Sequence, residues 1–152
     1  MMKIGMKRRK KMCNLLHEET AQKIKETGYG YKIFDVVDSQ SNYGAYYGMC
    51  TYDYKLKVGD TIEWDQERFP SDADKTGFCF IPTKKEATDL FRAWYKKCSS
   101  WQTSELVLCR IKYEQGLGRC KDFITIGEST WNIGICRKFT IIEEIKRESA
   151  RR

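Results

Sequence analysis

This chain has about six segments with the residue pattern of a β-strand and two with that of a helix, and no other feature constrains its fold as much. Parallel strands need a long crossover connection, usually a helix, between each strand and the next. Two helices are too few to connect a parallel sheet of this size. We therefore expect an α+β fold in one domain, with a sheet that is mostly antiparallel.

The two helical segments are marked by different signals. The first would begin at Asn14, a favourable N-cap residue, and run to about Thr27, where Gly28 would end it. The second begins with a capping box, in which Thr83 and Glu86 satisfy the first backbone N–H groups. The apolar residues that follow have the spacing of a buried helix face, and they are Ala87, Leu90, Phe91 and Trp94.

The predicted strands are rich in aromatic and β-branched residues, which suit the pleated surface of a sheet. They cover residues 31–37, 46–54, 57–64, 77–81, 106–113, 122–126 and 133–145. Glycine and polar residues predict a turn over residues 39–44 and another at Gly116-Leu117-Gly118. Val58-Gly59-Asp60 predicts a tight turn or bulge, and residues 65–76 predict a polar loop.

Size and composition indicate one ordered unit. The chain has 152 residues, of which 41% are hydrophobic and 13% aromatic, so it can bury a core. No apolar run reaches the roughly 18 residues of a membrane-spanning helix. The segment after the basic N-terminus is too polar for a signal peptide. We therefore expect a cytoplasmic protein that makes no contact with a membrane.

Cysteine spacing argues against a disulfide framework and against zinc. The seven cysteines are an odd number, and no two of them lie two to four residues apart, as zinc ligands usually do. We expect most of these thiols to be small buried hydrophobic side chains. The sequence thus predicts no metal and no cofactor.

Positive charge is concentrated at the two ends of the chain. Residues 1–12 carry +6 and residues 146–152 carry +3, so that only −2 of the total of +7 remains for residues 13–145. We interpret these as a basic N-terminal arm, a basic C-terminal tail and an α+β domain between them. Clustered Lys and Arg attract nucleic acid because binding releases phosphate counterions. The predicted nucleic-acid contacts are Lys7, Arg8, Arg9, Lys10, Lys11, Arg151 and Arg152.

An alternative interpretation of the arm is a leader without a binding role, since translation from Met12 would remove it. Two further groups are candidates for contacts with a partner. Tyrosines crowd residues 29–54, where they could stack on bases or anchor a protein interface, although they are also ordinary strand residues. Cations on the second helix could extend a binding surface or simply be solvated, as could Arg119 and its neighbours on the sheet. The predicted partner contacts are Tyr43, Tyr46, Tyr47, Lys84, Lys85 and Arg92.

Several short motifs follow one another in a recurring order. They are Tyr31-Lys32-Ile33-Phe34, Val58-Gly59, Gly77-Phe78, Thr83 with Glu86-Ala87, and Ile142-Glu143-Glu144-Ile145. This order resembles a group of small, largely uncharacterised proteins from phages and prophages. In that group a histidine follows Gly-Phe, whereas this chain has Cys79, so any chemistry of that histidine would be lost or altered here. The resemblance implies a mobile element, and hence a bacterial cytoplasm, but no activity.

The leading functional hypothesis is a small non-catalytic binding protein of phage or mobile-element origin. The basic arm would dock on a nucleic acid or ribonucleoprotein, and the protein would act as an anti-defence, anti-CRISPR-like inhibitor of an RNA-guided effector. Salt would weaken such binding steeply.

Two other classes of function stay open. One is a nucleotide-binding sponge or a degenerate ADP-ribosyltransferase, which would need a deep pocket lined by Tyr and Arg. The order of Arg110, Ser129-Thr130 and Glu143 or Glu144 superficially resembles the Arg, Ser and Glu of those enzymes. The other class is a structural protein that binds packaged nucleic acid without specificity.

Overall fold

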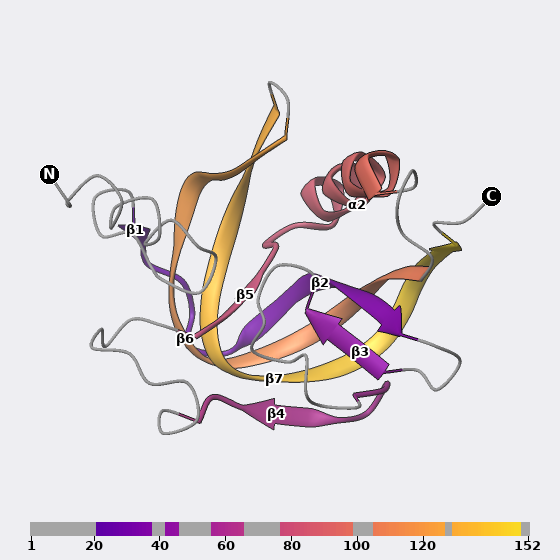
Figure 1. Cartoon of the computed structure of the whole chain (residues 1–152). Helices are drawn as coiled ribbons and strands as arrows, with labels where there is room; N and C mark the ends of the chain where they lie inside the picture. The colour runs from indigo at the N-terminus through magenta and orange to yellow at the C-terminus, as the bar shows by residue number, and fades with distance from the viewer. Residues whose placement is uncertain are drawn as a thin grey trace, which may run out of the picture.

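Antiparallel pairing joins all the strands of the described chain into one sheet of seven strands. The computed structural model describes residues 21–37, 42–45, 56–65, 77–98, 105–126 and 129–149. The elements are β1 (Ala21–Gln22), β2 (Gly28–Val37), β3 (Asn42–Ala45), β4 (Thr61–Glu63), β5 (Phe78–Phe80), α2 (Lys84–Cys98), β6 (Glu105–Ile126) and β7 (Ser129–Ser149). A mainly antiparallel sheet with one described helix agrees with the α+β class expected from the sequence (Figure 1).

The long hairpin of β6 and β7 is the centre of the sheet. The strand order is β3-β2-β6-β7-β4, and β1 and β5 join the outer edges of β6 and β7. Tyr31 of β2 and Ile81, which follows β5, exchange two backbone hydrogen bonds of 2.9 and 2.7 Å. This bridge completes a ring of strands that runs from β2 through β6, β7 and β5 back to β2.

Both hairpin strands bend into a U (Figure 1). Their pairing register shifts at four places, which lie between Leu108 and Cys109, Arg110 and Ile111, Gly116 and Gly118, and Cys120 and Ile124. Extra residues in one strand of a pair bend and twist it locally. Near the bend Gln115 has a φ of 55°, which is uncommon for a residue other than glycine.

Helix α2 lies between the two arms of the U (Figure 1). Its buried residues Ala87, Leu90 and Phe91 share one hydrophobic cluster with Leu108 on one arm and Ile133 on the other. The predicted capping box is confirmed at the start of this helix, since the Glu86 N–H donates to Thr83 Oγ1 at 3.2 Å. The side chain of Trp94 lies outside the described ones.

The opposite face of the sheet buries a second cluster, rich in aromatic rings. Phe78 packs edge-on against both Trp64 and Phe139, with ring centroids 5.2 and 5.1 Å apart. Ile62 of β4 and Leu56 belong to the same cluster, so the edge strand β4 and the segment before it add side chains to this core. A sheet with both faces covered explains the long apolar runs in its central strands.

The first predicted helix is wrong over the part that the structure describes. Ala21 and Gln22 form β1 opposite Cys120 and Arg119, and no helix follows before β2. The thin apolar stripe of this segment favours a helix only weakly, and backbone pairing with β6 overrides that preference. Ile24 still packs against the aromatic cluster. Residues 14–20 lie outside the described chain.

Of two predicted turns, one is wrong and the other is only partly right, since the chain reverses between Val37 and Asn42, which pair. Gly116-Leu117-Gly118 lies inside β6 at a register shift, and the hairpin reverses between Ile126 and Ser129, which pair. Glycine gives the backbone the freedom that a bulge needs as well as that of a turn, so the sequence does not separate the two. Residues 42–44, predicted as a turn, belong to β3, where Gly44 lies opposite Asp35. The backbone hydrogen bonds of β2 thus decide their conformation.

The other strand predictions hold in part. Residues 31–37, 77–81, 106–113, 122–126 and 133–145 fall on β2, β5, β6 and β7, whereas the strand predicted over 57–64 shortens to Thr61–Glu63. It follows a confirmed tight turn, in which Gly59 has a φ of 99° and the Asp60 N–H donates to the Lys57 carbonyl. Residues 146–149 of the predicted tail continue β7. Residues 46–54 and 66–76 lie outside the described chain.

Candidate functional site

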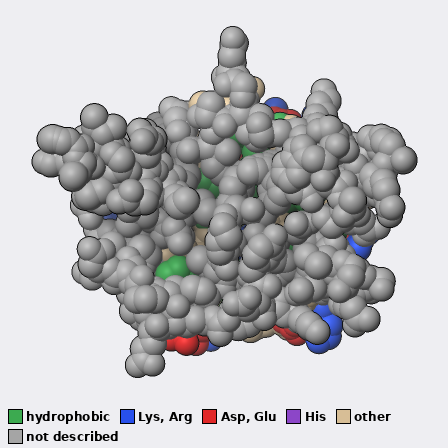
Figure 2. Space-filling view, viewed as in Figure 1, with side chains coloured by type: hydrophobic (Ala, Val, Ile, Leu, Met, Phe, Trp, Pro, Cys, Tyr) green, Lys and Arg blue, Asp and Glu red, His purple; other side chains and the backbone are tan. Residues whose placement is uncertain are grey.

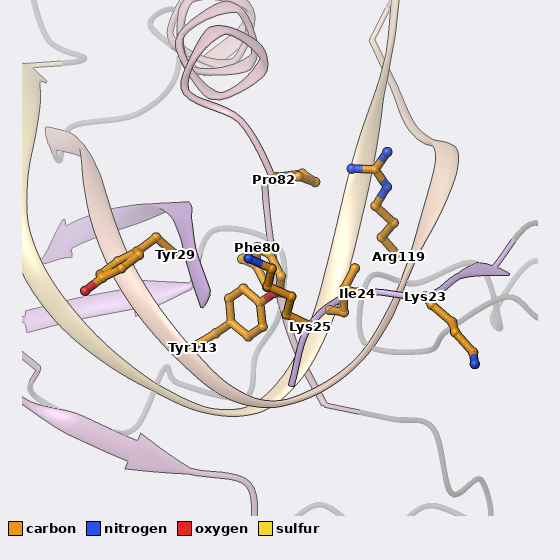
Figure 3. Close-up of a pocket in the computed structure, with 8 residues that line it drawn as sticks. All are labelled: Lys23, Ile24, Lys25, Tyr29, Phe80, Pro82, Tyr113 and Arg119. Atoms are coloured by element: carbon orange, nitrogen blue, oxygen red, sulfur yellow. The ribbon is translucent and has the colours of Figure 1, made fainter. Parts of the chain in front are cut away.

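An open pocket lies beside the bend of β6, next to the segment that joins β1 to β2 (Figure 3). Its volume is about 540 Å³. The lining residues come from three stretches of the chain, residues 23–29, 80–82 and 113–119, and they are Lys23, Ile24, Lys25, Tyr29, Phe80, Pro82, Tyr113 and Arg119. We call this the basic pocket, because all the charged residues in its described lining are cations.

A stacked aromatic pair forms the apolar side of the basic pocket. The rings of Phe80 and Tyr113 have centroids 4.5 Å apart and are inclined by 20°. Glycines on the neighbouring strands make room for them, because a Cβ at Gly30 or Gly134 would collide with the ring of Phe80. Burial raises the pKa of the Tyr113 hydroxyl, which therefore stays protonated and able to donate a hydrogen bond.

Three cations line the basic pocket together with this pair. Lys23 and Lys25 are exposed on the segment before β2. This segment is joined to β6, because the carbonyl of Glu26 accepts a hydrogen bond of 3.0 Å from the Gly116 N–H. Arg119 of β6 donates from Nε to Gln22 Oε1 at 3.0 Å, which orients its guanidinium. In the described part of the chain, no carboxylate forms an ion pair with these three side chains. The pocket therefore combines unpaired positive charge with aromatic surface.

Elsewhere on the surface, charges of both signs lie close together. Figure 2 shows acidic and basic side chains along the lower edge of one face. Lys138 lies 4.0 Å from Glu114, and Arg147 lies 2.6 Å from Glu144. Such exposed pairs contribute little to stability, but they remove the excess positive charge that would attract an anion.

The ring of Tyr29 is held at one end of the basic pocket. Tyr29 is 53% exposed, and the guanidinium carbon of Arg110 lies 4.2 Å from the centroid of its ring. Arg110 Nη1 in turn lies 3.9 Å from Glu143 Oε2 on β7. A cation over an exposed ring contributes about 0.5–1 kcal/mol, so this contact favours one orientation of the ring.

The arrangement suggested by the order of ADP-ribosyltransferase residues does not assemble. Arg110 and Glu143 do lie opposite each other in the sheet. Ser129, however, pairs with Ile126 at the tip of the hairpin, at the other end of β7. The structure therefore brings the arginine and the glutamate together without the serine.

The thiols of the described core are poorly suited to chemistry. Cys79, Cys109, Cys120 and Cys136 are buried, as the sequence predicts for most cysteines of this chain. Burial raises the pKa of both Cys109 and Cys136 to about 12, so these thiols stay protonated at neutral pH. Within the described ranges no group of three or more His, Cys, Asp or Glu residues could hold a metal ion.

A buried ammonium lies beside Cys79, the residue at the position of the phage group's histidine. Lys32 is 4% exposed, and its Nζ donates to the Cys79 carbonyl at 2.6 Å. The same Nζ lies 3.8 Å from Cys79 Sγ and 5.8 Å from the ring centroid of Phe139. We interpret this group as structural, because it binds a backbone carbonyl inside the core.

The residues predicted from sequence as contacts lie away from the basic pocket or outside the described chain. Lys84, Lys85 and Arg92 are exposed on α2, where Asp89 lies 3.4 Å from Lys85 and 3.7 Å from Arg92. Tyr43 belongs to β3, but its side chain is not among the described ones. The remaining predicted contacts lie outside the described chain, and they are Lys7, Arg8, Arg9, Lys10, Lys11, Tyr46, Tyr47, Arg151 and Arg152.

The sequence did not reveal the pocket as a site. Lys23 and Lys25 fall within the first predicted helix, which does not form there, and Arg119 is one of several cations on the sheet. A signal was nevertheless present, because Lys23, Lys25 and Tyr29 lie within seven consecutive residues. The pairing of both β1 and β2 with β6 brings them into one pocket with Arg119.

No helix in the described part of the chain is long and apolar enough to cross a membrane. The chain matches no protein-family model, no curated protein and no solved structure.

Proposed function

We propose that this protein is a non-catalytic nucleic-acid-binding protein and that its basic pocket holds phosphates of the bound strand. The observation that carries the proposal is the set of Lys23, Lys25 and Arg119 that line one pocket with a stacked aromatic pair, with no acidic side chain among the described lining residues. Cations bind phosphates and release their counterions, while aromatic rings offer surface to bases.

Binding fits the pocket better than catalysis does. The buried thiols of Cys109 and Cys136 are protonated. Arg110 and Glu143 lie close together, but no serine or other nucleophile among the described residues joins them. A catalytic site would need a nucleophile or base next to the bound group. The pocket instead offers hydrogen-bond donors and positive charge.

The salt dependence of binding tests this proposal. We expect a fluorescein-labelled single-stranded RNA to bind the wild-type protein, and its affinity to fall as salt rises. The triple variant Lys23→Ala, Lys25→Ala, Arg119→Ala should bind more weakly, and the slope of log affinity against log salt should shrink by roughly 2, since each single-strand contact contributes about 0.7.

The matched control removes exposed cations that lie away from the pocket. Lys84→Ala with Lys85→Ala lowers the net charge on α2, where both side chains are exposed. We expect this variant to keep most of the affinity and of the slope. A triple variant that binds like wild type with an unchanged slope would refute a role of the pocket in binding phosphates.

A finer proposal concerns the biological role. A mobile-element inhibitor that docks on an RNA-guided effector in the bacterial cytoplasm would need a surface for exposed RNA. The basic pocket and the phage-like order of motifs support this role. Co-expression with a guide-RNA nuclease should then lower its interference against a target plasmid, and the triple variant should restore interference. If the wild-type protein leaves interference unchanged for every effector tested, the inhibitor role is contradicted.

A free nucleotide is the second candidate ligand. A volume of about 540 Å³ lies within the range of small-molecule pockets, and the lining contains the Tyr and Arg residues that a nucleotide site needs. ATP or another nucleotide should then raise the melting temperature in the absence of nucleic acid. No shift at millimolar nucleotide would leave nucleic acid as the better ligand.

A further inference from the structure

We infer that Tyr29, backed by Arg110, is a platform on which one unpaired base stacks, so that the basic pocket selects single-stranded over double-stranded nucleic acid. This inference rests on the proposed nucleic-acid-binding function and adds the class of ligand. It names a residue pair whose role differs from that of the three pocket cations.

The exposure of Tyr29 is the first observation. Only two large hydrophobic residues of the described chain are exposed, Tyr29 at 53% and Val58 at 45%. Val58 lies in a tight turn, where exposure needs no further explanation. Tyr29 lies within a regular strand, opposite Lys112 of β6, and its ring could have been covered by neighbouring side chains.

The support behind the ring is the second observation. The guanidinium of Arg110 covers part of the ring at 4.2 Å, and Glu143 lies 3.9 Å from that guanidinium. The exposed part of Tyr29 is therefore the part that Arg110 does not cover. A ring that is already oriented loses less conformational freedom when a base stacks on it, which favours binding.

The place of the platform relative to the cations is the third observation. Tyr29 lines the same pocket as Lys23, Lys25 and Arg119, and Figure 3 shows it on the opposite side of the Phe80 and Tyr113 pair from Arg119. A strand whose phosphates contact the cations can therefore present a base to Tyr29. In a duplex the bases are already paired and stacked, so no base is available to the ring without unstacking.

The test compares three ligands of equal length by fluorescence anisotropy. They are a single-stranded oligonucleotide, the corresponding duplex, and a single strand that carries abasic positions at the same phosphate spacing. We expect Tyr29→Ala to weaken binding of the intact single strand by roughly 5- to 100-fold, the effect of removing one stacking partner. Binding of the duplex and the abasic strand should change less than twofold.

Three further variants complete the experiment. Tyr29→Phe should keep the affinity, since the ring remains, and Arg110→Ala should lower it less than Tyr29→Ala does. Val58→Ala removes the other exposed hydrophobic side chain and should change nothing. Because Tyr29 is exposed, we expect its variants to fold, and an unchanged melting temperature checks this.

The outcomes separate this inference from the proposed function. If Tyr29→Ala binds the single strand like wild type, or loses the abasic strand equally, the stacking platform is refuted. In that case, weak binding by the Lys23, Lys25 and Arg119 triple variant would still support the proposed function. If neither variant changes binding, both are wrong.

Discussion

At the scale of single residues, burial in the core keeps the thiols of Cys109 and Cys136 protonated. Cys136 shows the balance, because the nearby Lys32 ammonium lowers the pKa of its thiol while burial raises it more strongly, to about 12. Cys109 reaches a similar pKa, since burial and the Glu144 carboxylate both disfavour its thiolate. A thiolate buried away from water has no polar medium to stabilise its negative charge, so burial favours the neutral thiol. These residues therefore act as small hydrophobic side chains.

The raised pKa values predict a loss of stability at high pH. Between pH 9 and 12 the unfolded chain ionises these thiols while the folded chain does not, so the free energy of unfolding falls as pH rises. The fall is about 1.4 kcal/mol per pH unit for each thiol, and below pH 9 it is absent. Urea unfolding at pH 7 to 10.5 measures it. The slope should become smaller in Cys136→Ala, and an equal slope in that variant would contradict the prediction.

At the scale of elements, the glycines of β2 and β7 decide how β5 packs. Phe80 stands between the two strands, and a side chain at Gly30 or Gly134 would occupy the space of its ring. The ring in turn stacks on Tyr113, which lines the basic pocket. Strand packing and pocket shape thus depend on the same contacts.

Gly134→Ala should destabilise the protein by about 1–3 kcal/mol, because the added methyl group overpacks the core against Phe80. Chemical denaturation of the variant measures this loss. A smaller side chain at position 80 should reduce this loss of stability, so that Gly134→Ala destabilises the Phe80→Leu variant less than it destabilises the wild-type protein. Equal losses in both backgrounds would show that the ring of Phe80 is not the obstacle.

Local signals in the sequence predicted some elements correctly and left others open. Helix α2, which Thr83 caps, was predictable because its capping box and its apolar spacing lie within a few residues. The segment at Gly116-Leu117-Gly118 was not, since glycine suits both a turn and a bulge. The basic pocket was the least predictable feature, because Lys23 and Arg119 come to line the same pocket through the register of β1 on β6.

At the scale of the whole molecule, the distribution of charge sets the expected behaviour. The chain carries a net +7, of which +6 belongs to residues 1–12, so the arm and the pocket cations are two separate sources of attraction for a polyanion. Each phosphate contact adds its own share to the salt dependence of binding. The two sources can therefore be measured one at a time.

Deletion of residues 1–11 tests the arm. If the arm contacts phosphates, the truncated protein should bind RNA more weakly and show a flatter dependence of log affinity on log salt. Combining the deletion with the pocket triple variant should reduce the slope by the sum of the two separate reductions if each set of cations contacts its own phosphates. A truncated protein that keeps the wild-type affinity and slope would show that the arm makes no contact. The deletion leaves Lys23, Lys25 and Arg119 in place. Comparing the truncated protein with and without the pocket triple substitution would then show whether the described domain binds nucleic acid.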